Sequence, residues 1–432
     1  MQIKRRKSAV IGSLALTSAL ALAGCGSDSG GDSAGGGGGG ESGGSGDTTL
    51  TLWHGYTEAD GDVLQAIVDG FNESQEQWTV ETEEMAWSSL SEKLLTSLGA
   101  GNGPNIVVQG VDTGLGYVNQ GAFVSLQDYY DNPEYTSSEA LYPNLVEQVT
   151  WDGETYGIPM GTAAFAVYYN KDLWAQAGLT DADIPTTVEE LIEVAKRLTV
   201  DSNGDGEPET YGMSLPDQDA GTLAAMLHSG GGDFITDGEA RLDSEENVAT
   251  LEMWQDAFVN DKISPPGMDA VASMELFGAG RAAMILNGPW QITSSQSFGI
   301  DVGVFGWPSD WVQGVANYWY ATSMNDSEEE LAGVKAFGDW WNSKDMQVKW
   351  TESYYPPNRD DITEAEFSDP LVATVSEFSG NAFYYATGIS TSVTDITAET
   401  DSMMTQIAQG GDVEELLSSA QQTVEGYLAN GS

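Results

Sequence analysis

The chain has 432 residues and a formal charge of −52, because 67 Asp and Glu stand against only 15 Lys and Arg. A surface this acidic repels nucleic acid and anionic lipid headgroups, which excludes nucleic-acid binding. The single cysteine excludes an internal disulfide.

The N-terminus has the order of an export signal. Residues 4–7 are basic, and residues 9–22 form an apolar stretch too short and too rich in small residues to span a bilayer comfortably. The stretch ends in LAGC at Cys25, which resembles the lipobox of bacterial lipoproteins. This resemblance implies that residues 1–24 are a lipoprotein signal peptide and that Cys25 carries the lipid. An ordinary secretory signal with a chance cysteine and an uncleaved anchor are the alternatives.

A low-complexity segment follows the cysteine. Residues 25–47 are mostly Gly, Ser and Asp, cannot bury apolar surface, and predict a flexible Gly/Ser linker. Such a tether has a mean reach on the order of 25 Å. Since four of the 15 basic residues lie in the signal, the mature chain would keep 11 basic residues and a formal charge of about −56. We interpret this bias as an adaptation for solubility rather than as the mark of a cationic partner.

The remaining body, residues 48–432, is longer than one core normally holds and predicts two domains. Its strand and helix signals alternate, which indicates an α/β fold. The first hundred residues of the body read as β-α-β-α-β, the pattern of a mostly parallel sheet, with strands at 49–53, 78–83 and 105–109 and helices at 62–71 and 88–98. A second set of elements begins near Phe165, with strands at 165–169, 282–286 and 302–307 and helices at 187–198, 220–228, 253–259, 274–279, 331–342 and 413–428.

Several short phrases occur in one order along the body. They are PNIV at 104–107, GIP at 157–159, YYNKDLW at 168–174, GRAAM at 280–284, NGPW at 287–290 and YPP at 355–357. The ordered set resembles the extracellular solute-binding proteins of ABC importers, in particular the carbohydrate-binding group related to maltose-binding protein. The resemblance covers about residues 48–430.

The resemblance implies a two-lobed, periplasmic-binding-protein-like α/β fold with a hinge and an interlobe ligand cleft. By analogy, residues 48–158 and about 305–345 form lobe one, and residues 159–300 and about 346–432 form lobe two. The chain is expected to cross between lobes near 157–159, 299–303 and 344–355.

A sugar presents C–H faces to aromatic rings and hydroxyls to paired donors and acceptors, so its site needs Trp or Tyr beside polar side chains. Open α/β sheets bind ligands beyond the carboxyl ends of their strands. Both conditions select His54, Tyr56 and Glu58 after the first strand, although this loop could instead cap the next helix. Trp87 follows a strand in the same way, with a core role as its alternative.

The turn after the third strand carries Gln109 and Asp112. The resemblance implies a sugar-holding Trp and Asp here. Asp112 matches, whereas Gln109 stands in place of the Trp, which argues against a maltodextrin ligand.

The best single candidate is Trp290, because the corresponding Trp of the family's NGPW phrase stacks on sugar; packing in the core of a lobe is the alternative. Tyr168 is a second candidate, with a role in the sheet core equally open. Tyr318 and Trp319 belong to three adjacent aromatics whose side chains alternate between sheet faces, so we expect at least one to be exposed or in the cleft. The last candidates lie near the third crossing, where Arg359 could bind ligand or form a salt bridge: Tyr354, Tyr355 and Arg359.

An acidic loop at 201–209 has the spacing of the first half of a calcium loop. Its oxygen ligands would be Asp201, Asn203, Asp205, Glu207 and Glu209. The closing bidentate Glu is missing, since Gly212 holds the twelfth position. A structural Ca²⁺ and a plain acidic turn are both consistent with this loop, and no other cofactor is expected.

Residues 48–432 hold no G-x-S-x-G, H-E-x-x-H, P-loop or dinucleotide fingerprint, and the chance matches to glycine patterns lie in the Gly/Ser linker. We therefore predict no enzyme but a monomeric, lipid-anchored binding protein on the extracytoplasmic face of the cell membrane, which captures a sugar and delivers it to ABC permease subunits. A surface-anchored glycosidase is the alternative, because among 67 acids some pair stands at catalytic spacing by chance.

Overall fold

The structure is a computed structural model that describes residues 48–57, 59–236, 238–379, 382–384, 389 and 393–430. The predicted signal peptide, Cys25 and the linker lie outside these residues. Within the described ranges, no helix combines the length and the apolar composition that crossing a bilayer requires.

The first sheet has six strands, in the order β13-β12-β3-β1-β2 with β6 paired to β12. They are β1 (Thr48–His54), β2 (Trp78–Glu84), β3 (Ile106–Gly110), β6 (Gly157–Ala164), β12 (Val312–Ala321) and β13 (Ala382–Phe383). β1 lies parallel between β2 and β3, so the predicted parallel β-α-β-α-β unit is confirmed. β12 runs antiparallel to both β3 and β6, so a strand from far along the chain completes the sheet.

Helices cover both faces of the first sheet. Leu50 and Leu52 point to one face and are buried against α1 (Ala59–Ser74) and α12 (Glu328–Trp341). α12 begins with a capping box formed by Ser327 and Glu330, which satisfies its first backbone amides. The other face packs against α2 (Trp87–Gly99). Short helices α3 (Val111–Asn119), α4 (Gln127–Asp131), α5 (Pro143–Glu147) and α13 (Lys344–Trp350) complete this part, with the β4–β5 ribbon (Thr150–Trp151 and Glu154–Thr155).

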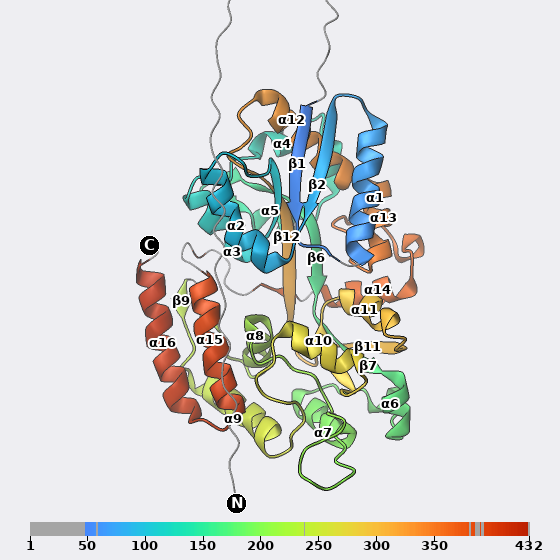
Figure 1. Cartoon of the computed structure of the whole chain (residues 1–432), viewed down its shortest axis with the longest axis vertical. Helices are drawn as coiled ribbons and strands as arrows, with labels where there is room; N and C mark the ends of the chain where they lie inside the picture. Colours follow the sequence, from blue (N-terminus) through green and yellow to red (C-terminus); the bar gives the residue numbers. More distant parts are fainter. Residues whose placement is uncertain are drawn as a thin grey trace, which may run out of the picture. The chain divides into compact units, whose positions relative to one another are not determined.

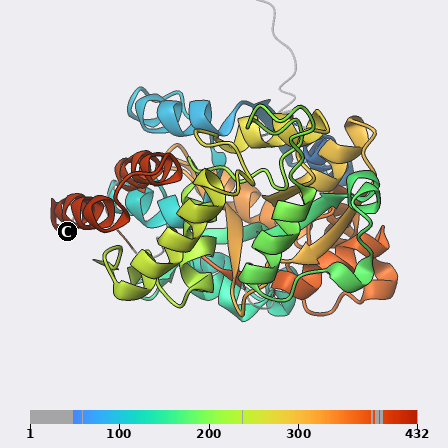
Figure 2. The ribbon, with the colours of Figure 1, turned by 90° about the horizontal axis from the view of Figure 1, so that it is seen from below.

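The second sheet has three strands in the order β10-β7-β11, and both pairs are antiparallel. They are β7 (Ala166–Asn170), β10 (Met284–Asn287) and β11 (Val302–Gly306), near the three strands expected from the sequence. Its surrounding elements are α6 (Lys171–Gln176), α7 (Val188–Leu198), α8 (Ala220–Ser229), α9 (Glu245–Val259), α10 (Ala270–Gly278), α11 (Trp290–Ser297), α14 (Pro370–Ser379), α15 (Val393–Ala408), α16 (Val413–Asn430) and the ribbon of β8 (Ile235–Thr236) and β9 (Glu239–Ala240). α15 and α16 lie side by side, as Figures 1 and 2 both show.

The chain passes from the first sheet to the second at Phe165, between β6 and β7, and returns between Gly306 and Val312 (Figure 1). Residues 157–159, where we expected a crossing, instead begin β6. Residues after 345 were assigned to lobe two, yet Trp350 and Tyr355 pack in the core beneath the first sheet. The two long strands β6 and β12 therefore carry the backbone from one sheet toward the other.

Trp341 is the central tryptophan of the first core. It is fully buried, packs edge-to-face on Trp319 with ring centroids 4.9 Å apart, and donates its indole hydrogen to the carbonyl of Met160 at 2.7 Å. Replacing Trp341 with Ala should lower the free energy of unfolding by about 3–5 kcal/mol, because it leaves a cavity in the core and removes one of the two side-chain hydrogen bonds to the Met160 carbonyl. Denaturation in urea measures this loss. Trp311→Ala, at a half-exposed Trp, should change stability by less than about 0.5 kcal/mol. Equal losses in both variants would contradict this reading of the core.

Candidate functional site

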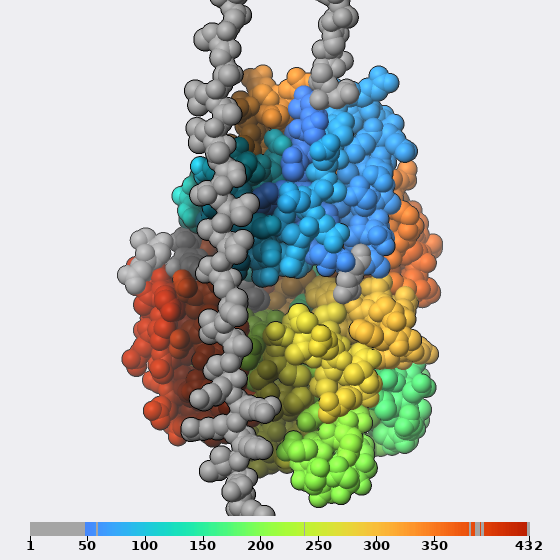
Figure 3. Space-filling view, in the orientation of Figure 1, coloured from blue at the N-terminus to red at the C-terminus, as the bar shows by residue number. Residues whose placement is uncertain are grey.

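A cavity of about 500 Å³ lies where the first-sheet elements meet those of the second sheet. Figure 3 shows the recess between the elements around α2 and those around α10. Six of the residues selected from the sequence line it: Tyr56, Trp87, Gln109, Asp112, Trp290 and Tyr355. These six residues come from five separate segments of the chain. The fold therefore brings together many of the candidates that were selected because ligands bind beyond the carboxyl ends of strands.

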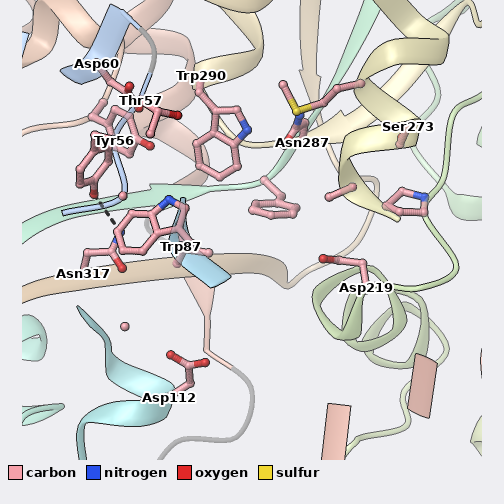
Figure 4. A pocket seen from close by; sticks show the side chains of 18 of the residues that line it. Tyr56, Thr57, Asp60, Trp87, Asp112, Asp219, Ser273, Asn287, Trp290 and Asn317 are labelled. Carbon is pink, nitrogen blue, oxygen red and sulfur yellow. Dashed lines mark hydrogen bonds between the residues drawn. The ribbon is translucent and has the colours of Figure 1, made fainter. Parts of the chain in front are cut away.

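Tyr56 anchors the floor of the cavity. Its hydroxyl accepts a hydrogen bond from the Asn317 amide at 2.8 Å (Figure 4). The same hydroxyl donates a hydrogen bond to the Met160 sulfur at 3.1 Å. Burial raises the pKa of this hydroxyl, so Tyr56 stays neutral. Its ring stands edge-on to Trp87 at 5.3 Å and to Tyr355 at 6.1 Å, measured between centroids. The result is a rigid aromatic corner at one end of the cavity.

Trp87 and Trp290 each have their indole ring packed against a glycine, and this close packing places both rings beside the cavity. A Cβ atom on Gly55 would stand 2.2 Å from the Trp87 ring, and one on Gly288 would stand 2.2 Å from the Trp290 ring. Only glycine permits this approach of a ring to the backbone. Trp290 is further fixed by an edge-on contact with Phe165 at 5.7 Å. Figure 4 shows Trp87 and Trp290 as neighbouring rings beside the cavity.

Three carboxylates line the cavity, and each belongs to the start of a helix. Asp60 lies in the first turn of α1, Asp112 in the first turn of α3, and Asp219 is the N-cap of α8, where it accepts the amide of Thr222 at 2.7 Å. The dipole of each helix favours a negative charge at these positions. Burial nevertheless raises the pKa of the Asp112 and Asp219 carboxyls, although backbone amides oppose the shift.

Among the described residues that line the cavity there is no Lys, Arg or His. The basic residue His54, two positions before Tyr56, is buried and does not line the cavity. Burial lowers the pKa of its imidazole to about 4. It is therefore neutral at pH 7. The lining is aromatic, amide-bearing and acidic.

The sequence model of one protein family, the bacterial extracellular solute-binding proteins, matches residues 66–374, which is most of the chain. The chain belongs to this family. A maltotriose-binding protein from Pyrococcus abyssi is 26% identical over 267 residues, covering 60% of this chain and 53% of that protein. The glycerol-3-phosphate-binding periplasmic protein UgpB from Brucella melitensis is 23% identical over 340 residues, covering 74% of this chain and 77% of that protein.

Among solved structures, the ABC substrate-binding protein of Listeria monocytogenes in complex with cycloalternan superposes with a TM-score of 0.77 at 19% identity, covering 89% of this chain and 99% of that one. This likeness confirms the two-lobed periplasmic-binding-protein-like α/β fold. The resemblance drawn from the ordered phrases is confirmed as well.

Six of the selected residues lie outside the cavity of this solute-binding protein, and Glu58 lies outside the described residues. One of the six, Tyr354, accepts a hydrogen bond from the Gln296 amide at 3.0 Å. His54, Tyr168, Tyr318 and Trp319 are buried in the cores, and Arg359 forms a bidentate ion pair with Asp361 at 2.8 Å for each contact. The expectation that one of three adjacent aromatics is exposed was wrong. Tyr318 and Tyr320 face the core with α2, and Trp319 faces the core with α12, so both faces of β12 are covered.

Several lining residues were missed by the sequence reading. Phe165 sits at the crossing between β6 and β7, Asn287 ends β10, and Asn317 precedes the aromatic run of β12. Asn287 was already quoted in the NGPW phrase, so its strand-end position was a usable signal. Asp219 shows only an ordinary helix-cap pattern, and nothing in the sequence separates it from other capping aspartates.

The acidic loop at 201–209 is ordered by its own donors. Asp201 accepts the amides of Gly204 and Gly206 at 2.7 and 2.9 Å, and Glu209 accepts the amide of Ser202 at 2.7 Å. Glu207 pairs with Lys262. No group of three acidic, His or Cys side chains in the described part of the chain is arranged to hold a metal ion. The loop as the structure has it is an acidic turn held by hydrogen bonds to its own backbone amides.

The pKa of the Asp401 carboxyl, on α15, is also raised. Burial, with the charges of Asp219 and Asp217, raises its pKa to about 6, against about 4 in an unfolded chain. Its ionised form thus destabilises the fold above pH 6, and the penalty disappears as the pH falls toward 4. Asp401→Asn should therefore raise stability at pH 7.5, by ~1 kcal/mol after allowance for solvent screening of this partly exposed group, and should change nothing near pH 4.

Thermal unfolding measured from pH 4 to 8 tests this expectation. Glu414→Gln, at an exposed carboxylate of α16, removes one negative charge elsewhere and should leave the profile parallel to the parent's. A stabilisation by Asp401→Asn that is equal at both ends of the range would show that the effect is not titration.

Proposed function

We propose that this protein captures a saccharide in the cavity between its two lobes and delivers it to the permease subunits of an ABC importer. The observation that carries the proposal is the convergence of Tyr56, Trp87, Trp290 and Tyr355 with amide and carboxylate side chains around one cavity. Aromatic faces and paired hydrogen-bond groups are the two features that a sugar needs.

The size of the cavity supports the same proposal. Its volume of about 500 Å³ lies within the range of ordinary small-molecule sites. It fits a mono- or small oligosaccharide. The names of similar proteins, which include a binder of maltotriose and a structure in complex with cycloalternan, favour a carbohydrate.

Ligand capture in this proposal is a hinge motion. Lobe one would be the part built around the first sheet, including Trp350 and Tyr355, and lobe two the part built around the second sheet, with the chain crossing at Phe165 and between Gly306 and Val312. A ligand that contacts both walls of the cavity stabilises the closed arrangement by its differential affinity for it.

We also propose that the protein acts as a monomer tethered through a lipid on Cys25 to the extracytoplasmic face of the cell membrane. The LAGC phrase and the Gly/Ser segment behind it support the anchor. Two or more acyl chains give stable membrane attachment where one gives only marginal binding. The linker would leave the body free to rotate near its permease.

The similar proteins are binding proteins rather than enzymes. We extend this to the chain itself and propose reversible binding without turnover, against the alternative of a surface-anchored glycosidase. Since Asp60, Asp112 and Asp219 line the cavity and a glycosidase works with carboxylates, turnover itself has to be measured to separate the two.

Incubation of the unlipidated chain, residues 26–432, with a glycan panel tests binding and turnover together. We expect a saturable change in Trp fluorescence, because Trp87 and Trp290 line the cavity, and we expect the sugar to be recovered unaltered. Chromatography of the sugars measures turnover. Catalytic release of shorter sugars would establish the glycosidase instead.

Trp290→Ala locates the site. Loss of one stacking ring should weaken sugar binding by about tenfold or more while the Tm stays close to that of the parent. Trp311→Ala is the matched control, since Trp311 is half exposed and does not line the cavity. Equal affinities of the Trp290 variant and the parent would remove the cavity from consideration as the sugar site.

Cys25→Ser tests the anchor. In a bacterial host, labelled fatty acid should enter the parent chain but not the variant, because Cys25 is the only thiol available for acylation. Membrane fractionation should show the parent with the membrane. Incorporation of label into the Cys25 variant would refute the proposed attachment site.

A further inference from the structure

The chain turns sharply at Tyr354, directly after the short helical segment η3 (Thr351–Ser353). Tyr354 has a φ of 66° and a left-handed backbone conformation, which Gly or Asn usually adopts at the end of a helix. A tyrosine in this conformation carries a steric cost, because its Cβ comes close to the following carbonyl oxygen. Contacts of the Tyr354 side chain therefore have to offset this cost.

The two consecutive tyrosines of this turn pack against opposite lobes. Tyr354 packs against the buried cluster around the second sheet. Tyr355 is buried in the core of the first sheet, where its ring centroid lies 5.1 Å from that of Trp350. Pro356 follows and restricts the backbone of Tyr355 to extended conformations. The turn is thus a stiff link with one side chain in each lobe.

Helix α11 contacts both tyrosines. Near the C-terminal end of α11, the Gln296 amide donates a hydrogen bond to the Tyr354 hydroxyl at 3.0 Å. At its N-terminal end, the ring centroid of Trp290 lies 6.0 Å from that of Tyr355, and Trp290 packs against the first-sheet core. Figure 1 shows α11 at the level where the elements of the two sheets meet. A helix held at both ends in this way does not rotate or slide without displacing the Trp290 ring.

The buried face of α11 is fixed by a ladder of side-chain hydrogen bonds. Asn287 donates to Gln291 at 2.8 Å, and Gln291 donates to Ser295 at 2.9 Å. All three residues are buried, and a buried hydrogen-bond network favours a single arrangement of its members. The ladder sets the rotation of α11 against β10. The contacts with the Tyr354 turn set where the helix stands relative to the first lobe.

We propose that Tyr354 is a positioning residue for ligand capture, which holds the Trp290 ring against Tyr355 through α11. This inference rests on the proposed function and adds to it a residue that does not itself line the cavity. The pair of rings is then in place before the ligand arrives. Tighter binding follows, because a ring that is already ordered loses little conformational entropy when the sugar stacks on it.

Tyr354→Asn removes the ring and keeps the turn, because Asn tolerates the left-handed conformation. The Tm should therefore remain close to that of the parent. We expect the affinity for a saccharide that the parent binds to fall about tenfold, since the Trp290 ring is then free to move. Tyr354→Phe should stay within about threefold of the parent affinity, because it keeps the ring and loses only an exposed hydrogen bond.

A double-mutant cycle shows whether Tyr354 acts through Trp290. In the Trp290→Ala background, adding Tyr354→Asn should lower the affinity by less than about twofold, because no ring is left to position. A purely structural role of Tyr354 would lower the affinity equally in both backgrounds, and that result would overturn the inference.

The position of the ring is measured without any ligand by fluorine NMR of residues 26–432 labelled with fluorotryptophan. The Trp290 resonance is assigned by its loss in Trp290→Phe. Tyr354→Asn should shift or broaden this resonance, while that of Trp311, assigned in the same way, stays in place. Tyr142→Asn is the control, because Tyr142 is 39% exposed, does not line the cavity, and holds the N-cap position of α5, which Asn tolerates. It should change neither the resonance nor the affinity.

The failure of this inference is distinguishable from the failure of the proposed function. An unmoved Trp290 resonance or an unchanged affinity in folded Tyr354→Asn would overturn the inference and leave the proposed function standing. If the parent binds no saccharide, the proposed function falls, and the fluorine spectrum alone decides whether Tyr354 holds the ring.

A second variant covers a loss of stability. If Tyr354→Asn lowers the Tm, Tyr354→His takes its place, because His also tolerates the left-handed region and keeps a smaller ring. It should move the Trp290 resonance and the affinity in the same direction by a smaller amount. No change in either would count against the inference.

Discussion

The pairing of β12 with two strands at once is the constraint on which the cavity depends. On one edge β12 lies antiparallel to β3, and on the other it lies antiparallel to β6, with a shift of register between Asn317 and Tyr318. A bulge of this kind re-aims one side chain while the ladder continues. Here it leaves Asn317 free to donate to Tyr56, so the fixed position of the aromatic corner follows from the sheet.

The same two strands explain how one cavity can take side chains from both sheets. β6 continues through Phe165 into β7, and β11 leads back into β12, so the cavity walls are joined by backbone that lies beside the cavity itself. Phe165 both sits at this crossing and holds Trp290 by an edge-on contact. A motion of one lobe relative to the other would therefore displace the aromatic rings that line the site.

Most of the fold was predictable because its signals are local. The strands at 49–53, 78–83 and 105–109 and their helices carry clear apolar periods, and the structure places all of them. The site was less predictable, because it depends on which face of a strand is covered. Tyr168 and Trp319 have the same composition signal as Trp290, yet helices cover them, whereas Trp290 begins a helix beside the cavity. Asp219 could not have been found, since its role depends on where α8 begins relative to a wall built from residues far away in the sequence.

The many acidic residues on the surface of the protein and the few that line the cavity have different physical consequences. With 67 acids and 15 bases in the chain, a set of lining residues without a base is expected by chance, so the count alone carries little weight. Exposed carboxylates are screened by solvent and counterions and impose no requirement on a ligand. Asp112 and Asp219 are different, because partial burial weakens that screening and raises the pKa of their carboxyls. Helix N-termini offset part of this cost and hold the charges in place. It is the partial burial of these few groups, rather than the total charge, that sets the electrostatics of the cavity.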